Sequence, residues 1–275
     1  ETNSAAIDAS DVRDGNHLIS NNLIENTTGA GIQVSFHEFS ATGTITITNN
    51  TIIGNTYYGI NVSSAHPGTS SHIINITSNS IISSGGGINI RGRPAINMRY
   101  NRIHDNNGTA LDYTDDSNNN SVEYNTITGN TGTSLINIVN NRIGDAGTIR
   151  YNNFIRGTET YLLYNDDSVS NNSTLNYENN WWGTTNTTNL DGLIYDWNDN
   201  ATKGAIDYTP LLTEPNTTAP PAPPTNVAAQ TGTNSIALTW AANAESDIAG
   251  YKIYYDTDQS GYPYANSVDV GNVTT

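Results

Sequence analysis

The stretch Asn49-Asn50-Thr51-Ile52-Ile53-Gly54-Asn55, followed by Gly59-Ile60-Asn61-Val62, contains the unit that repeats along the first two-thirds of this 275-residue chain. In this unit an asparagine lies three residues after one apolar residue and two residues before another. The unit recurs with 22 to 29 residues between successive asparagines, at Asn21, Asn50, Asn79, Asn101, Asn125, Asn152 and Asn180. Such a period predicts a solenoid, in which each coil buries its apolar side against the neighbouring coils.

Apolar residues alternate with polar ones inside each repeat, as in Ile60 with Val62 and Ile88 with Ile90. Alternation is the period of a β-strand. We therefore expect three short strands in each coil: one before the asparagine, one after it, and one after a glycine. The asparagines are expected to adopt left-handed turn angles. Because stacked strands lie about 4.8 Å apart, their amides are also expected to hydrogen-bond along the axis.

These motifs resemble the coil repeats of the right-handed parallel β-helix family with the pectin-lyase-like fold. The resemblance covers roughly residues 10–212, and it implies an all-β fold class. Proteins of this family include polysaccharide lyases, hydrolases, epimerases, adhesins and segments without known chemistry. A shared fold therefore does not select one activity among them.

Bulky aromatic residues interrupt the repeat at Trp181-Trp182-Gly183. We expect them to cap the last coil, which would otherwise expose apolar core and an unpaired strand edge. The alternative is that Trp181 and Trp182 form a platform for sugar rings. The β-helix with its cap is predicted to span residues 1–213. Residues 214–224 are rich in proline and are predicted to form an extended, semi-rigid linker.

Residues 225–275 differ in composition from the repeats. The segments around Trp240 and from Tyr251 to Tyr255 resemble the opening strands of a fibronectin type III domain. An immunoglobulin-like β-sandwich of this kind needs about 100 residues. We therefore expect an incomplete sandwich, a chain that continues beyond Thr275, and an N-terminus trimmed before Glu1.

The composition argues against several partners. A formal net charge of −16 disfavours nucleic acids and anionic membrane surfaces, which require clustered Lys and Arg. No apolar run approaches the roughly eighteen residues of a spanning helix, so no membrane insertion is expected. The chain has no cysteine, which leaves its redox compartment undetermined. Its resemblance to acidic solenoids joined to fibronectin-like modules implies a secreted or cell-surface protein. The best candidate glycosylation sequons begin at Asn107, Asn119 and Asn216.

Acidic residues offer candidate sites in two repeats that lie two coils apart. The candidates are Asp112, Asp115, Asp116, Asp166 and Asp167. Resemblance to lyases of this fold implies calcium bound by such acids, and resemblance to hydrolases implies an acid–base pair. The alternative is that these aspartates lie in ordinary solvated turns. Calcium is the one possible cofactor.

Basic residues are scarce in the chain, but five of them lie within fourteen residues. They are Arg91, Arg93, Arg99, Arg102 and His104. One hypothesis is a groove for an acidic glycan, in which Arg99 or Arg102 abstracts a proton from the sugar. Asp115 and Asp116 would complete that catalytic site, and the other three basic residues would bind carbohydrate. The alternative is weak surface pairing with neighbouring acids.

The leading functional hypothesis is a noncatalytic β-helix module of a larger extracellular or cell-surface protein. Such a module would face carbohydrate, mediate adhesion, or assemble with other copies of itself. One alternative is a polysaccharide lyase or glycoside hydrolase acting on an acidic glycan, which requires converging acids and a base. Another is a subunit of a surface sheath or filament, which requires open ends or complementary faces.

Overall fold

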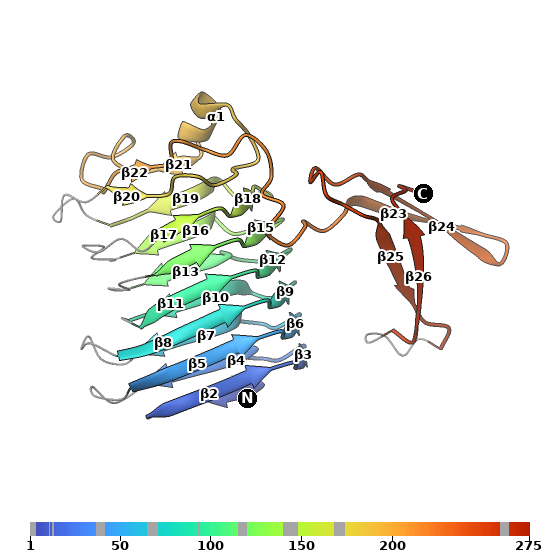
Figure 1. Cartoon of the computed structure of the whole chain (residues 1–275), viewed down its shortest axis with the longest axis horizontal. Helices are drawn as coiled ribbons and strands as arrows, with labels where there is room; N and C mark the ends of the chain where they lie inside the picture. The colour runs from blue at the N-terminus through green and yellow to red at the C-terminus, as the bar shows by residue number, and fades with distance from the viewer. Residues whose placement is uncertain are drawn as a thin grey trace. The chain divides into compact units, whose positions relative to one another are not determined.

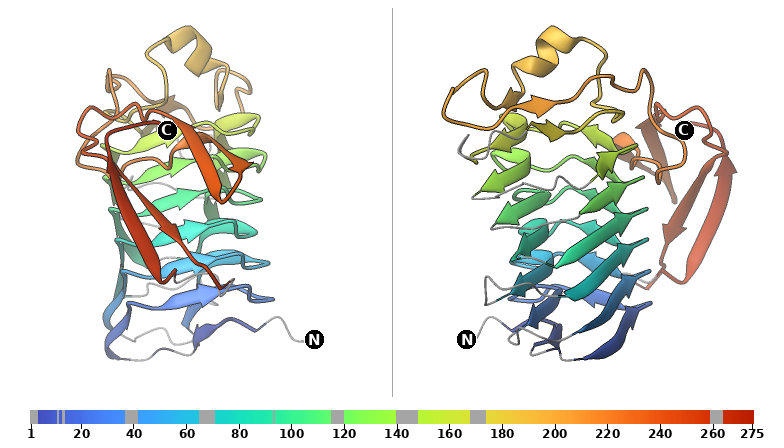
Figure 2. Two further views of the ribbon diagram at one scale, coloured as in Figure 1. Left: turned by 90° about the vertical axis from the view of Figure 1, so that its right-hand side faces the viewer. Right: turned by 60° about the vertical axis from the view of Figure 1, so that its left-hand side comes forward.

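The computed structural model describes residues 4–10, 12, 14–36, 42–64, 71–92, 94–114, 120–139, 148–167, 174–258 and 264–275. The chain divides into two compact units, Glu1–Pro220 and Pro221–Thr275. In the first unit, six successive coils of three strands stack along one axis, as Figures 1 and 2 show from several sides. All strand pairs between coils are parallel. The prediction of an all-β parallel β-helix is therefore confirmed.

Each coil contributes one strand to each of three sheets. Sheet A consists of β1 (Ile7–Ala9), β4 (Ile32–Phe36), β7 (Tyr58–Ser64), β10 (Gly86–Arg91), β13 (Leu111–Thr114), β16 (Ser134–Val139), β19 (Tyr161–Asn165) and β21 (Ile194–Tyr195). Sheet B consists of β2 (Gly15–Ser20), β5 (Thr42–Thr48), β8 (Ser71–Thr77), β11 (Ala95–Arg99), β14 (Ser121–Glu123) and β17 (Thr148–Arg150). Sheet C consists of β3 (Leu23–Glu25), β6 (Thr51–Ile53), β9 (Ser80–Ile82), β12 (Arg102–His104), β15 (Thr126–Thr128) and β18 (Asn153–Ile155).

A row of asparagines joins the coils at the turn between sheets B and C. In each coil the side-chain oxygen accepts hydrogen bonds from the backbone N–H and the Nδ2 of the asparagine one coil earlier, at 2.9–3.0 Å. The row consists of Asn22, Asn50, Asn79, Asn101, Asn125, Asn152 and Asn180. Six of the seven positions are those that the repeat spacing singles out.

The first coil lies one residue out of the predicted register. Asn22 occupies the row instead of Asn21, and Ile24 packs into the core instead of Leu23. This part of the chain contains the doublets Leu18-Ile19, Asn21-Asn22 and Leu23-Ile24, so the pattern fits either register. Pairing with β5 decides between them, because it places Ile19 opposite Ile47 and leaves Leu18 67% exposed.

The left-handed turn residue is not the row asparagine but the residue directly before it. The backbone φ angle lies between 55° and 61° at Asn21, Asn49, Ser78, Tyr100, Tyr124, Tyr151 and Asn179. None of the row asparagines has a positive φ. The expectation of left-handed angles at Asn50 and its equivalents is therefore wrong. The row asparagine serves as the hydrogen-bonding group, and its neighbour makes the turn.

The core consists of columns of apolar side chains, one from each strand. On sheet C the column runs from Ile52 through Ile81 and Ile103 to Phe154 and Trp182, all at most 1% exposed. Glycines at the start of the sheet A strands keep the corner narrow. A Cβ at Gly59 would lie 2.3 Å from Cγ2 of Ile81, so any side chain there would clash with the core.

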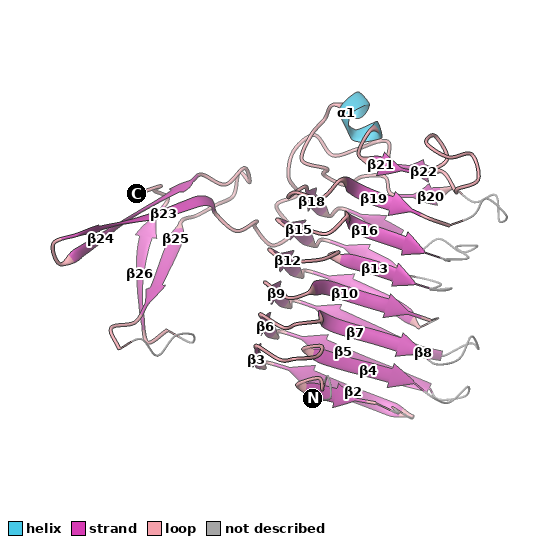
Figure 3. Cartoon of the chain, turned by 180° about the vertical axis from the view of Figure 1, so that it is seen from behind, coloured by secondary structure: helices cyan, strands magenta, loops and turns pink. Residues whose placement is uncertain are grey.

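The C-terminal end of the solenoid is covered by residues that follow the last complete coil. They include β20 (Leu175–Asn176), α1 (Thr187–Asp191) and β22 (Ile206–Asp207). Figure 3 shows the helix α1 beyond the last rungs of the sheets. Leu175, Leu190 and Ile206 join the same apolar core as Trp182.

Part of the predicted proline-rich linker packs on the solenoid. The backbone N–H of Asn216 donates to Oδ1 of Asn153 at 2.7 Å, and Nδ2 of Asn153 donates to the carbonyl of Asn216 at 3.1 Å. Ala219 is 4% exposed. Residues 214–220 therefore belong to the first unit.

The second unit contains two antiparallel strand pairs. One pair consists of β23 (Thr225–Gly232) and β24 (Ser235–Ala241), and the other of β25 (Tyr251–Tyr255) and β26 (Asn266–Gly271). Trp240 of β24 is 9% exposed and packs edge-on against Tyr251 of β25, with 5.3 Å between ring centroids. In the described part of the whole chain, no helix has the length and apolar character needed to span a membrane.

We expect Asn125→Ala to lower the free energy of unfolding by about 3 kcal/mol or more, because several buried polar groups lose their partners. The Asn125 amide accepts from Asn101 and donates to the carbonyls of Met98 and Glu123. Asn21→Gly is the matched control, since glycine tolerates the left-handed angle. Denaturant unfolding measures both variants. An equal loss in the two would contradict the assignment of the row.

Candidate functional site

The structure separates the basic residues that the sequence brings close together. Arg91 lies on β10 in sheet A, Arg99 on β11 in sheet B, and Arg102 and His104 on β12 in sheet C. Arg93 lies outside the described residues. Because consecutive strands of a coil belong to different sheets, the four described residues do not share one sheet face. A single cationic groove that includes Arg93 stays a prediction.

The acidic candidates are separated as well. Asp112 lies in register with Asn137 and Tyr164 rather than with Asp166. Its carboxylate accepts from the Tyr58 hydroxyl at 2.5 Å and from Nδ2 of Asn137 at 2.9 Å. The Tyr58 pKa is raised above its usual value by burial and by this acid.

The described acids do not fit a calcium site. Asp166 is paired with Lys203, whose ammonium also donates to the Asp166 carbonyl at 3.0 Å. The backbone N–H of Asp167 donates to Oδ1 of Asn165. Within the ranges that the structure describes, no three His, Cys, Asp or Glu residues are placed to hold a metal ion. Asp115 and Asp116 lie outside those ranges.

The two tryptophans at the end of the repeat differ in their environments. Trp182 is 1% exposed and packs on Phe154 in the core, with 5.0 Å between ring centroids. It therefore cannot stack on a sugar, and that candidate role is wrong. Trp181 is half-buried and bridges to Asn153 at the edge of sheet C.

The predicted glycosylation residues are placed as follows. Asn107 is exposed in the turn after β12. Asn119 lies outside the described residues. Asn216 is half-buried, and its Nδ2, the atom that a glycan would modify, donates to the Tyr151 carbonyl at 2.6 Å.

The outer face of sheet A carries a ladder of amides. Nδ2 of Asn61 donates to Gln33 at 2.6 Å, and Nδ2 of Asn89 donates to Asn61 at 2.7 Å. In the same register the next residues are Asp112 and Asn137, which are also hydrogen-bonded to each other. This face therefore presents a regular column of side-chain donors and acceptors.

Three tyrosines follow the amide ladder at the C-terminal end of sheet A. Tyr164 and Tyr195 stack with 4.6 Å between centroids and 13° between planes, and Tyr161 lies 5.5 Å from Tyr164. We call Tyr161, Tyr164 and Tyr195 the tyrosine cluster. All three are half-buried. The pKa of Tyr164 is raised by burial first and by the nearby Asp166 second.

A second set of tyrosines lies at the turn between sheets B and C. Tyr100, Tyr124 and Tyr151 directly precede row asparagines in three successive coils, and we call them the tyrosine row. Neighbouring rings are nearly parallel, with 5.6 Å between centroids in both pairs.

The tyrosine row is strained. A bulky side chain at a left-handed backbone angle costs about 1–2 kcal/mol, whereas a stacked aromatic pair returns about 0.5–1.5 kcal/mol beyond its burial. Three strained residues are stabilised by only two stacked pairs. Other coils place Asn or Ser at the same turn, so stability alone does not account for tyrosine there.

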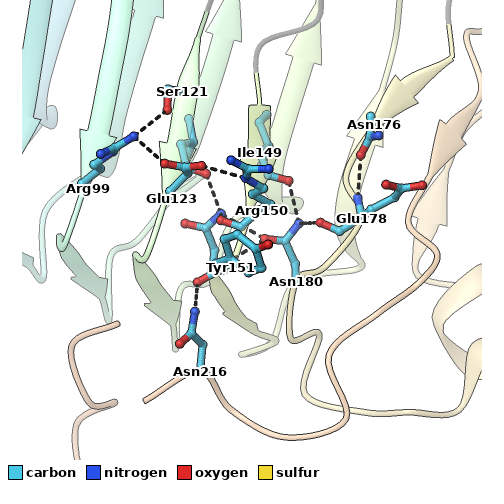
Figure 4. Close-up of polar contacts among 12 residues, drawn as sticks. Arg99, Ser121, Glu123, Ile149, Arg150, Tyr151, Asn176, Glu178, Asn180 and Asn216 are labelled. Carbon is cyan, nitrogen blue, oxygen red and sulfur yellow. Dashed lines mark hydrogen bonds and ion pairs between the residues drawn. The ribbon is translucent and has the colours of Figure 1, made fainter. Parts of the chain in front are cut away.

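Beside the tyrosine row, one buried carboxylate holds two arginines (Figure 4). Nη2 of Arg99 lies 2.5 Å from one oxygen of Glu123, and Nε of Arg150 lies 2.8 Å from the other. The Glu123 side chain is 6% exposed. The hydrogen bond to Glu123 raises the pKa of Arg150. The guanidinium carbon of Arg150 also lies 5.2 Å from the centre of the Tyr151 ring.

The sequence reasoning missed both tyrosine sets and the Glu123–Arg150 pair. A signal for the row was present, because the dipeptide Tyr-Asn occurs at 100–101, 124–125 and 151–152. The repeat was defined by the asparagine and its two apolar flanking residues. The residue directly before the asparagine was not part of that definition. The tyrosine cluster has no such signal, since Tyr195 belongs to the cap.

We expect Tyr124→Asn to change the free energy of unfolding by less than about 1 kcal/mol, because relief of strain offsets lost stacking. Asparagine occupies the equivalent turn at Asn49 and Asn179. Tyr113→Asn is the contrast, since Tyr113 is buried in the core and its loss should cost about 3–5 kcal/mol. Comparable destabilisation of both variants in urea would show that the row is a structural element.

His104 provides a prediction for pH. Its pKa is lowered from 6.5, because burial outweighs the attraction of Asp105, 2.8 Å away. That carboxylate is 57% exposed, so solvent screens it. The unfolded state therefore binds the proton more readily, and stability falls as pH drops below about 6.5.

The control for the His104 prediction is the variant His104→Thr, because threonine occupies the same register position one coil later, at Thr128. The melting temperatures of the two proteins are compared. Between pH 7.5 and 5.5 the unchanged protein should lose melting temperature relative to this variant. If both lose it equally, His104 does not contribute to the pH dependence.

Comparison with known proteins agrees with this architecture. Residues 42–201, more than half of the chain, match the family model described as the right-handed beta helix region. No curated protein and no solved structure gave a significant match. With its stacked three-strand coils and this match, the chain belongs to the right-handed β-helix family.

Proposed function

We propose that this chain is a noncatalytic, glycan-facing β-helix module of a secreted or cell-surface protein. The observation that carries the proposal is the outer face of sheet A. There a column of amides leads to the tyrosine cluster, in which Tyr164 stacks on Tyr195. Amides and hydroxyls suit sugar hydroxyls, and aromatic rings suit the apolar faces of sugar rings.

The geometry argues against catalysis on this face. A glycoside hydrolase needs two carboxyl groups on either side of one glycosidic bond. Of the described acids, Asp112 is bonded to Tyr58 and Asn137, and Asp166 is paired with Lys203. A lyase needs a base beside the sugar carboxylate, but Arg99 lies on sheet B and is bound to Glu123. The described residues therefore favour binding over turnover.

The proposal includes the finer fold assignments. The coils are assigned to the pectin-lyase-like type, on the basis of the asparagine row at the short turn between sheets B and C. The second unit is assigned to the start of a fibronectin type III sandwich. Two antiparallel pairs joined by the Trp240–Tyr251 contact support this assignment. A rigid solenoid followed by such a module is typical of modular surface proteins.

Binding and turnover are tested together with a panel of neutral and acidic polysaccharides. We expect retarded migration in affinity electrophoresis for at least one glycan, without release of reducing ends or unsaturated products. Tyr164→Ala/Tyr195→Ala should weaken this binding by about tenfold or more, as expected for buried aromatic anchors. Product release by the unchanged protein would overturn the noncatalytic assignment.

Tyr254→Ala is the control for nonspecific aromatic effects, because Tyr254 is 55% exposed and belongs to the second unit. It should leave retardation unchanged. Absence of binding across the panel, or binding that the double variant retains in full, would overturn the assignment of the tyrosine cluster as a glycan-facing surface.

A further inference from the structure

Besides the tyrosine cluster of sheet A, a second group of exposed side chains lies at the edge between sheets B and C, where β11, β14 and β17 end. The tyrosine row runs along this edge, with Tyr100 41% exposed and Tyr124 and Tyr151 half-buried. Its members come from three successive coils, so the row is parallel to the solenoid axis. The strain at each turn points to a function beyond folding.

Two arginines line this edge with free hydrogen-bonding capacity. The side chains of Arg99 and Arg150 are 44% and 47% exposed, although both contact Glu123. A guanidinium has five N–H donors, and Glu123 occupies only some of them. One carboxylate between two guanidiniums leaves a local positive charge in a chain with a net charge of −16. The edge therefore offers positive charge on a chain that is acidic as a whole.

Neighbouring groups hold the edge in place. The buried Glu123 carboxylate bridges the arginines of the coils before and after its own, and Arg99 also donates to Oγ of Ser121 at 3.5 Å. Nδ2 of Asn216 donates to the Tyr151 carbonyl at 2.6 Å (Figure 4). Donors fixed in this way lose little freedom when a ligand binds.

We propose that this edge binds an extended anionic polysaccharide, carboxylated or sulfated, that runs along the solenoid axis. The two guanidiniums pair with carboxylate or sulfate groups, for which their planar forks are suited. The tyrosine hydroxyls and exposed ring surfaces contact the sugars between those charges. The site lies on a different face from the tyrosine cluster, so it goes beyond the function proposed above and is tested separately.

The observations favour a polysaccharide over single-stranded nucleic acid. Nucleic-acid grooves combine a continuous positive track with open aromatic faces on which bases stack. Here the rings of Tyr100, Tyr124 and Tyr151 face one another, and two arginines supply the charge. Two separate guanidiniums beside a row of tyrosine hydroxyls match a glycan that carries acidic groups at intervals.

The test uses the whole chain and measures binding to polygalacturonate and dextran sulfate, with uncharged dextran for comparison. Both anionic polymers should bind, dextran should not, and added salt should weaken binding because exposed charges are screened. Tyr100→Asn/Tyr124→Asn/Tyr151→Asn should fold with an unchanged circular dichroism spectrum, since asparagine occupies this turn in other coils. Its affinity should fall by about tenfold or more.

A second variant, Arg99→Lys/Arg150→Lys, keeps the positive charges beside Glu123 but removes the planar forks. It should also weaken binding of the anionic polymers by about tenfold. Tyr57→Asn/Arg156→Lys is the matched control, since both residues are exposed and lie outside this edge. It should bind as the unchanged protein does.

Four outcomes would overturn the proposal. They are absence of binding to either anionic polymer, equal binding of dextran, retained affinity in both edge variants, and oligothymidylate binding that exceeds polysaccharide binding and is lost in the same variants. The last outcome would reassign the edge to single-stranded nucleic acid. Because the tyrosine cluster on sheet A is itself proposed to bind glycans, all four outcomes are measured with Tyr164→Ala/Tyr195→Ala present in every protein, so that binding at sheet A does not contribute.

Discussion

The hydrogen bonds of the asparagine row are the constraint on which the rest of the first unit depends. Each asparagine side chain bonds to the backbone and the side chain of its counterpart one coil away. A slip of one residue would break two bonds and turn every apolar strand residue outward. Because Asn50 and the five row asparagines after it are buried, neither loss is compensated by water there. Register is thus specified by polar contacts as well as by the core.

Fixed register converts a sequence repeat into columns of like side chains. A residue at a given place in the repeat lies about 4.8 Å from its counterparts above and below. Columns of this kind produce the isoleucine core, the amide ladder of sheet A and the tyrosine row. A functional surface of a solenoid is therefore built from such columns. A substitution in one coil also affects the contacts of the equivalent residues in the neighbouring coils.

Much of the fold could be predicted from the repeat, because its period and its alternation are both physical signatures of stacked strands. One exception was the first coil, where doublets such as Asn21-Asn22 fit two registers and only pairing with β5 decides. The site was less predictable. Arg91, Arg99 and Arg102 are close in sequence, yet the coil turns between them and places them on three faces. For Trp182 the sequence favoured a cap and left a sugar platform as the alternative, and its burial in the core excludes the platform.

The tyrosine cluster and the tyrosine row differ in the backbone conformation that their residues adopt. The tyrosine cluster on sheet A sits at half-buried strand positions, where aromatic residues fit the pleated surface without backbone strain. The tyrosine row occupies turns where asparagine or serine suffices elsewhere in the same solenoid. A strained residue repeated in three coils is stabilised by its surroundings only in part. The arginines bound to Glu123 add positive charge beside that row. That combination is what we expect of a surface arranged for a ligand rather than for stability.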